Sequence, residues 1–450
     1  MQLRDLIVTP LFILVVYALA FIIRPRVTNI YTKPYFIPAL TLKIIGAIGV
    51  CVIYQFYYGY GDTLFYYYQT TIIYEAFGNS FATGLKLLHV PKEFDPDTGP
   101  YIARMRFYGT GAEYLVCRVA AIIGLLCGNT FSAMAVGMSF LSFGGLWAMY
   151  TTFIKVRPHT YKLLAVGIFY FPSLFFWGSG VLKDTLCIGA LGWLLYAFYK
   201  GAIQKRAIVS CLVIGLIAAQ ALFILKVYIL LCFLPAALFW VFNENSTRIK
   251  NKVVRLAALP LFLAIGIGLS AYSVTNLTAN DASYSIDNIG ARSKKTADYL
   301  YEMSRAREGS GYRLGELDGT IGSMVKLAPQ AILTTLFRPF LWEARNPVML
   351  LSALESFYFL FLTIRIFYRV GLMKSLRLIA ANPMLTLCFV FSLVFSAAVG
   401  VTSNNFGTLV RYKIPMMPFY LCGLYILESI ATTEAPARRP VASPVRRQLA

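Results

Sequence analysis

TFSAMAVGMSFLSFGGLWAMYTTFIKVRPHTYK, residues 130–162, is the stretch that decides the fold class. Its first part, 130–154, carries no charged residue and is long enough to cross about 30 Å of hydrocarbon as a helix. Its second part is basic, with Lys155, Arg157 and Lys162 in a short loop. An apolar helix that ends in such a loop is typical of a membrane span whose basic end faces the cytoplasm.

Comparable apolar segments recur through most of the chain. Of its 450 residues, 58% are hydrophobic and 14% are charged, which would leave too much apolar surface on a soluble protein. We therefore predict one integral membrane domain, 1–430. The first segment has no small-residue cleavage site, so we expect a retained span rather than a signal peptide. The predicted spans are 4–23, 35–57, 130–154, 163–181, 184–200, 207–225, 227–242, 255–275, 347–367, 383–402 and 414–430.

The basic residues predict how these spans are oriented. Lysine and arginine crowd every second gap between the apolar segments, and such gaps are expected on the cytoplasmic side. Segment 113–128 is interrupted by Glu113 and Arg118 and is typical of a re-entrant or interfacial helix. If it does not cross, the chain has eleven spans, an outside N-terminus and a cytoplasmic C-terminus. If it crosses, there are twelve spans and the first two invert. The predicted fold class is an all-α polytopic helix bundle.

The net charge of +21 does not indicate a nucleic-acid partner, because the basic residues lie in short loops rather than in one patch. The eight cysteines lie in or beside apolar segments without metal-ligand spacing, so we interpret them as packing residues. His89 and His159 are too few and too far apart for a metal site. The Pro-, Ala- and Arg-rich segment 431–450 is predicted to be a disordered basic cytoplasmic tail.

Two long hydrophilic segments, about 58–129 and 276–346, fall on the non-cytoplasmic face in this topology. Part 292–309 of the second has helix-forming composition with charges throughout, which predicts an exposed helix. Part 322–341 is moderately hydrophobic and is expected at the membrane interface. Both segments are therefore predicted to carry juxtamembrane helices.

The first candidate site residues follow span ends on this outer face. Asp62 lies among tyrosines, where a carboxylate suits a general base or a cation ligand; the ordinary alternative is a helix cap. Lys183 and Asp184 form an outer hairpin after Trp177 and suit a phosphate-bearing lipid or sugar. The alternative is that Lys183 snorkels to the headgroups and Asp184 caps the next helix.

Two further motifs place charges on the same face. In TLFRPFLWEARNP (335–347), Arg338 beside aromatic rings can grip a phosphate while Trp342 stacks on a sugar; an interfacial salt bridge with Glu343 is the alternative. In TSNNFGTLVRYKIP (402–415), Arg411 and Tyr412 add a cation and an aromatic group. Carboxylates and cations framed by aromatic residues suit transfer of a sugar from a polyprenyl-phosphate donor. Asp62, Asp184 and Glu343 are the predicted catalytic residues; Lys183, Trp177, Arg338, Trp342, Arg411 and Tyr412 are the predicted substrate-binding residues.

With Asp62 at the start of a long outer segment, followed by 81–90 and 113–128, the chain resembles polytopic glycosyltransferases of the GT-C class and related bacterial polysaccharide polymerases. Gly61 precedes Asp62, so the acidic pair common in that class is not evident; the nearby candidates for a second carboxylate are Asp95 and Asp97 or Glu113. Only Asp62 is carried over as base or metal-linked carboxylate. The resemblance implies an enzyme of cell-envelope polysaccharide assembly in the bacterial inner membrane. It also implies a polyprenyl-linked donor and a lipid or glycan acceptor. The cofactor stays unknown, with a divalent cation considered.

Three other functions remain open from the sequence. A polysaccharide polymerase or ligase would use units carried on polyprenyl pyrophosphate and depend more on the outer arginines. A transporter or flippase would need ionisable residues inside the spans, where Lys43 and Glu355 are the main cases. A purely structural assembly partner would not require the outer charges.

Overall fold

The fold is that of an all-helical membrane protein in a computed structural model, which describes residues 3–89, 95–246, 286–306 and 310–433. These residues form helices joined by turns, and the β-pairing among them is one isolated bridge between Gly311 and Asn405. The predicted span 255–275 and most of the predicted tail 431–450 lie outside the described residues.

Seven helices of the described residues are long and apolar enough to cross a membrane, or eight if a bent pair counts as one span. This agrees with the predicted class of integral membrane protein; the predicted number of eleven or twelve spans is not reached in this part of the chain. The seven are α1 (Leu3–Val27), α2 with η1 (Lys33–Tyr58), α7 (Phe131–Val156), α10 with η4 (Lys183–Ile203), α11 (Ile208–Ser246), α15 (Pro347–Val370) and α17 (Pro383–Ser403). The bent pair is α18 (Phe406–Tyr412) and α19 (Met417–Thr433), which meet at 63°.

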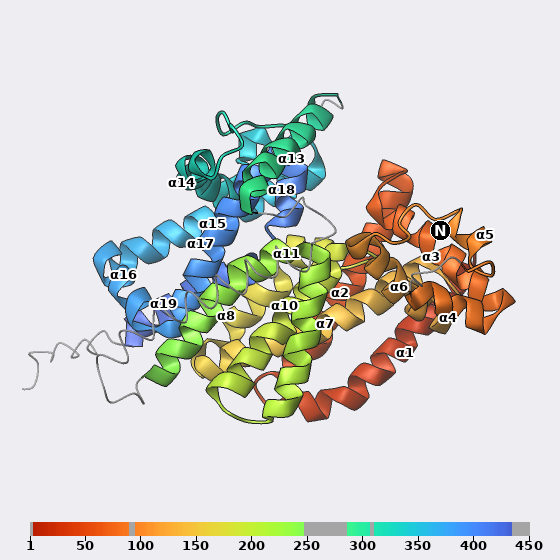
Figure 1. The fold of residues 1–450 in the computed structure, drawn as a ribbon. Coiled ribbons are helices and arrows are strands. Elements are labelled where there is room, and N and C mark those ends of the chain that lie inside the picture. Colours follow the sequence, from red (N-terminus) through yellow and green to blue (C-terminus); the bar gives the residue numbers. More distant parts are fainter. Residues whose placement is uncertain (1–2, 90–94, 247–285, 307–309, 434–450) are drawn as a thin grey trace, which may run out of the picture.

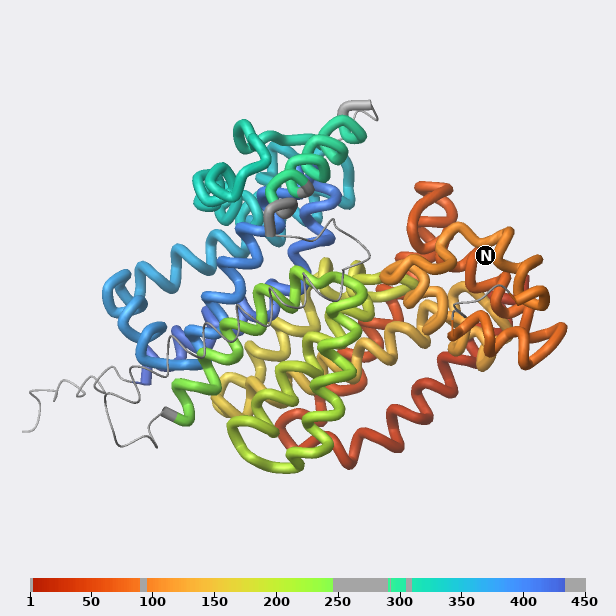
Figure 2. Tube along the Cα trace, in the orientation of Figure 1, coloured from red at the N-terminus to blue at the C-terminus, as the bar shows by residue number. Residues whose placement is uncertain are grey.

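One predicted span is interrupted in the structure, and one predicted break between spans is present as a kink within a helix. Predicted span 163–181 is divided into α8 (Tyr161–Ala165), η3 (Val166–Tyr170) and α9 (Pro172–Trp177). The break before α9 arises because Pro172 cannot continue the preceding helix. The predicted break between 207–225 and 227–242 falls inside α11, where Lys226 is non-helical with φ −153° and ψ 79°. Figure 2 shows the two halves of α11 running in different directions from this bend.

The predicted outer segments are largely helical. Segment 113–128 corresponds to α6 (Gly111–Leu126), whose 16 residues are fewer than the roughly 20 needed to cross a membrane. In Figure 1, α3 to α6 lie near the start of α1, and α13 and α14 lie over α18. The remaining elements are η2 (Pro158–Thr160), α3 (Asp62–Asn79), α4 (Phe81–His89), α5 (Gly99–Ile102), α13 (Ile286–Ala306), α14 (Ile321–Phe337), η6 (Leu341–Glu343) and α16 (Leu372–Ala381).

The centre of the bundle is a close crossing of α7 and α10 built on glycines. A Cβ atom added at Gly145 would lie 1.9 Å from the carbonyl oxygen of Gly189, and one added at Gly192 would lie 2.0 Å from that of Gly145. Small residues at such a crossing let two membrane helices approach backbone to backbone. This crossing fixes the position of the N-terminus of α10, where the candidate site begins.

Gly145→Ala is expected to destabilise the bundle by about 1–3 kcal/mol, because the added methyl group would have to push two backbones apart. Gly144→Ala is the matched control, since the nearest atoms to its methyl group would belong to the Trp193 ring, at an ordinary contact distance of 3.5 Å. Thermal unfolding of the purified protein in detergent measures the difference. Equal melting temperatures for the two variants would contradict a backbone contact at Gly145.

Candidate functional site

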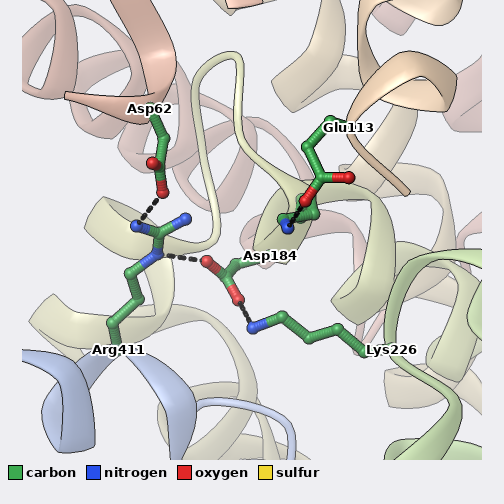
Figure 3. Close-up of polar contacts among 6 residues, drawn as sticks. Asp62, Glu113, Asp184, Lys226 and Arg411 are labelled. Carbon is green, nitrogen blue, oxygen red and sulfur yellow. Dashed lines mark hydrogen bonds and ion pairs between the residues drawn. The ribbon is translucent and has the colours of Figure 1, made fainter. Parts of the chain in front are cut away.

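Six charged side chains from five helices meet where α2 ends, α10 begins and α11 bends (Figure 3). We call this group the ion cluster. Its members are Asp62, Glu113, Lys183, Asp184, Lys226 and Arg411. Three carboxylates therefore face three cations, and their formal charges balance. Residues 349 positions apart in the sequence lie in direct contact here.

Asp184 is the centre of the ion cluster. It lies in the first turn of α10 and its side chain is 1% exposed. One carboxylate oxygen accepts a hydrogen bond from Lys226 Nζ, and the other accepts one from Arg411 Nε. A carboxylate in the first turn of a helix is also favoured by the helix dipole. Asp184 is thus a buried anchor for two cations, beyond the simple helix cap considered from the sequence.

Arg411 connects this buried anchor to the surface. Its Nη1 donates to Asp62 Oδ2 at 2.9 Å, and the Asp62 side chain is 50% exposed. Its second terminal nitrogen, Nη2, donates to no other side chain in the described part of the chain, and Figure 3 shows no contact for it among the drawn residues. The guanidinium is therefore held at its inner edge, while its outer edge faces an accessible carboxylate.

Lys226 reaches the ion cluster because α11 breaks at this residue. Its backbone leaves the helical region, which places the ammonium against Asp184 in the interior. The ammonium also lies 4.2 Å from the centre of the Tyr412 ring. A cation over an aromatic face is attracted by the ring, so Tyr412 supports the buried lysine. The structure therefore places Tyr412 against Lys226.

Lys183 and Glu113 form the outer side of the ion cluster, with Lys183 Nζ 2.8 Å from Glu113 Oε1. Burial opposes ionisation of Glu113, but the hydrogen bond and charge of Lys183 outweigh it and hold the pKa of that carboxyl below its usual value. Glu113 was considered from the sequence only as a possible second carboxylate. Its contact with Lys183 joins α6 to the start of α10.

The position of Asp62 depends on the glycine before it. Gly61 has φ +134°, a conformation that other residues rarely adopt, and a Cβ atom here would lie 2.4 Å from the Tyr54 ring. Tyr54 in turn packs edge-on against Trp177, with ring centres 6.5 Å apart. Trp177 is buried, so it supports Tyr54 from behind. This aromatic wall fixes the turn that carries Asp62.

Gly61→Ala is expected to cost about 1–3 kcal/mol and to displace Asp62, because the methyl group meets both backbone strain and the Tyr54 ring. Gly59→Ala is the matched control: Gly59 has φ +69°, but nothing lies within 4 Å of an added Cβ atom. Melting temperatures of the two purified variants test this. If Gly59→Ala is the more damaging change, the Tyr54 contact does not position Asp62.

The other predicted residues form a second group, centred on Arg338 and Glu343. Glu343 accepts hydrogen bonds from the Arg338 guanidinium and from Phe340 N at 2.8 Å. Burial opposes ionisation of Glu343, but Arg338 lowers its pKa below the usual value. Trp342 is 80% exposed and stacks on Phe340. Of the nine predicted residues, four thus belong to the ion cluster and two, Trp177 and Tyr412, support it. The remaining three, Arg338, Trp342 and Glu343, form this second group, which we call the Arg338 group.

The two groups meet through α18. The Arg338 guanidinium lies 4.8 Å from the centre of the Phe406 ring, and α18 runs from Phe406 to Tyr412. Lys413, just past the helix, donates to the Arg338 carbonyl at 3.3 Å. The helix that carries Arg411 into the ion cluster therefore also carries the aromatic support of Arg338.

Sequence reasoning did not include Lys226 or Tyr54 among the site residues. Lys226 had a signal, since it is a cation between two apolar runs on the predicted outer face, whereas Tyr54 was one of many tyrosines at a span end. Among the described residues, no three His, Cys, Asp or Glu side chains lie close enough to hold a metal ion. No family model, no curated protein and no solved structure matches this chain.

Proposed function

We propose that the protein is a membrane glycosyltransferase that moves a sugar from a polyprenyl-phosphate donor to a lipid or glycan acceptor at the ion cluster. The observation that carries this proposal is the pairing of the half-exposed Asp62 with Arg411, whose other edge is fixed by buried Asp184. A displaceable carboxylate on an immobilised guanidinium provides a base and a phosphate-binding group at one place.

In the proposed reaction the donor phosphate replaces Asp62 on Arg411. The phosphate displaces Asp62 from Arg411 Nη1 and also accepts a hydrogen bond from Nη2. These two nitrogens form the paired donors that arginine offers to phosphate. Asp62, released from its partner, then accepts the proton of the acceptor hydroxyl. The acceptor oxygen forms a bond to the anomeric carbon while the bond from that carbon to the phosphate oxygen breaks. Polyprenyl phosphate leaves with the electron pair, and Arg411 stabilises its negative charge.

Asp184 has a positioning role in this proposal, although the sequence suggested a catalytic one. With a side chain 1% exposed and both oxygens bound to cations, it is too enclosed to meet an acceptor hydroxyl. Lys226, supported by the Tyr412 ring, holds Asp184, and Asp184 in turn fixes Arg411. Lys183, paired with Glu113, is the other cation near the donor phosphate.

The Arg338 group is the proposed place for the sugar of the acceptor. Trp342 presents an exposed aromatic face, which suits stacking against the apolar face of a sugar ring. Glu343 is engaged by Arg338, and so we assign it the role of holding that arginine in place. This group would position the acceptor, and the ion cluster would carry the reaction.

The contacts favour a phosphate donor over the alternatives. A pyrophosphate carrier brings more negative charge, whereas the cations of the ion cluster are already balanced by carboxylates. For transport, the intramembrane charges would need to be available, but Glu355 accepts hydrogen bonds from Ser173 and Lys43 donates to the Gly178 carbonyl. Both charges thus stabilise the ends of the short helix α9.

The test is an assay of the purified chain in liposomes that contain a radiolabelled polyprenyl-phosphate sugar and a soluble or lipid-linked glycan acceptor. The expected result is label in a covalent glycan product together with release of polyprenyl phosphate. Movement of the intact labelled lipid between leaflets without a covalent product would overturn the proposal in favour of transport.

A further inference from the structure

Helix α1 packs against the bundle along one narrow face and leaves a large groove beside it. Of its 25 residues, those with buried side chains are Asp5, Thr9, Val16 and Ala20. In Figure 2, α1 is the red helix that runs along one side of the molecule. The groove between α1 and the bundle has a volume of about 1180 Å³. This exceeds the roughly 300–1,000 Å³ of ordinary small-ligand pockets, so it can take a long molecule.

The body of the groove is apolar, and two glycines form part of its wall. Leu19 and Ile23 of α1 face it from one side, and Gly137 and Gly144 of α7 lie on the other. At Gly144 the next atom beyond an added Cβ would be the Trp193 ring, at an ordinary contact distance of 3.5 Å. The groove therefore offers an apolar surface to hydrocarbon chains.

One end of the groove is basic. Arg26 and Lys155 line it, and Lys200 Nζ donates to the hydroxyl of Tyr196, another lining residue, at 2.7 Å. Within the described ranges, no carboxylate forms an ion pair with Arg26 or Lys155. This contrasts with the ion cluster, whose charges balance. The ion cluster also lies near the opposite ends of α2 and α10.

We propose that this groove binds an anionic membrane phospholipid, with its phosphate at Arg26 and Lys155 and its acyl chain along α1 and α7. Apolar walls that end in unbalanced cations match a molecule with a long hydrocarbon part and a single negative head. A second copy of the chain is a poorer occupant, because a symmetric contact through this face would bring the two basic ends together. The proposal does not depend on the proposed sugar transfer.

The test measures phosphatidylglycerol and phosphatidylcholine of equal chain length bound to the purified full chain by native mass spectrometry. The wild-type chain is expected to retain one phosphatidylglycerol in preference to phosphatidylcholine. The double variant Arg26→Gln, Lys155→Gln should bind phosphatidylglycerol about thirtyfold more weakly, since each cation beside an anionic lipid is worth about fivefold. Both side chains are exposed, so the variant should keep its fold.

Lys374→Gln with Arg377→Gln is the matched control, because it removes two exposed cations of α16 that do not line the groove. It should bind phosphatidylglycerol as the wild type does. Gly144→Leu, which fills the groove without changing charge, should lower the binding of this lipid. Equal losses in the control and groove double variants would overturn the proposal. So would equal retention of the two lipids, or crosslinking of two copies through Val15→Cys.

Discussion

Asp62→Asn is expected to lower the rate of sugar transfer about 10²–10⁴-fold, the range that a positioned general base contributes. The amide keeps the size of the side chain but has no carboxylate to accept the acceptor proton. The free energy of unfolding should change by no more than about 1 kcal/mol, because the Asp62 side chain is half exposed and its ion pair lies at the surface. Initial rates in liposomes and melting temperatures of the same preparations measure the two effects.

Glu75→Gln is the matched control for this prediction. Glu75 also lies on α3, its side chain is 45% exposed, and it pairs with Arg104 through two hydrogen bonds of 3.0 and 2.8 Å. It lies outside the ion cluster, so its replacement should leave the transfer rate near that of the wild type. Comparable losses in both variants would mean that Asp62 acts only through the general charge of α3. Full activity of Asp62→Asn would remove Asp62 from the mechanism.

Asp184→Ala is expected to be the most destabilising change in the ion cluster, by about 3–5 kcal/mol. It leaves the buried Lys226 without its carboxylate partner and takes one of two partners from Arg411. Removing one partner of a buried ion pair leaves an uncompensated charge, which costs more than the pair itself contributed. Thermal unfolding in detergent, followed by circular dichroism, should show a clearly lower melting temperature.

The double variant Asp184→Leu, Lys226→Met separates stability from activity. It removes both the buried carboxylate and the buried ammonium, and apolar replacement of a buried pair is often neutral in stability. We expect it to recover much of the stability that Asp184→Ala loses. It should stay poor in transfer, because Arg411 no longer has a fixed inner edge. Recovery of the transfer rate along with stability would contradict a positioning role for Asp184.

The fold class could be predicted from composition because a bilayer requires long apolar helices whatever their arrangement. The break at Lys226 was also predictable, since a cation interrupts two apolar runs there. Pro172 can be recognised in the sequence as a residue that interrupts an apolar run. The division of predicted span 163–181 into short helices was nevertheless not predicted. Local sequence features thus predicted the positions of helix breaks better than the contacts that form at those breaks.

The partners within the site were beyond the sequence. Nothing local indicates that Arg411 would reach both Asp62 and Asp184, since these contacts depend on how α3, α10 and α18 pack. The same is true of Lys183 and Glu113, which meet across 70 positions. The sequence predicts that these charges share one face of the membrane. Their division into the ion cluster and the Arg338 group depends on how the helices pack and could not be predicted.

The most direct test of the proposed mechanism is the affinity of polyprenyl phosphate for Asp62→Asn, measured beside the transfer rate. If phosphate competes with Asp62 for Arg411, losing a surface pair of about 1 kcal/mol should tighten binding about fivefold. The transfer rate should fall at least about a hundredfold in the same variant. Binding that weakens together with transfer would contradict the exchange of Asp62 for phosphate on Arg411.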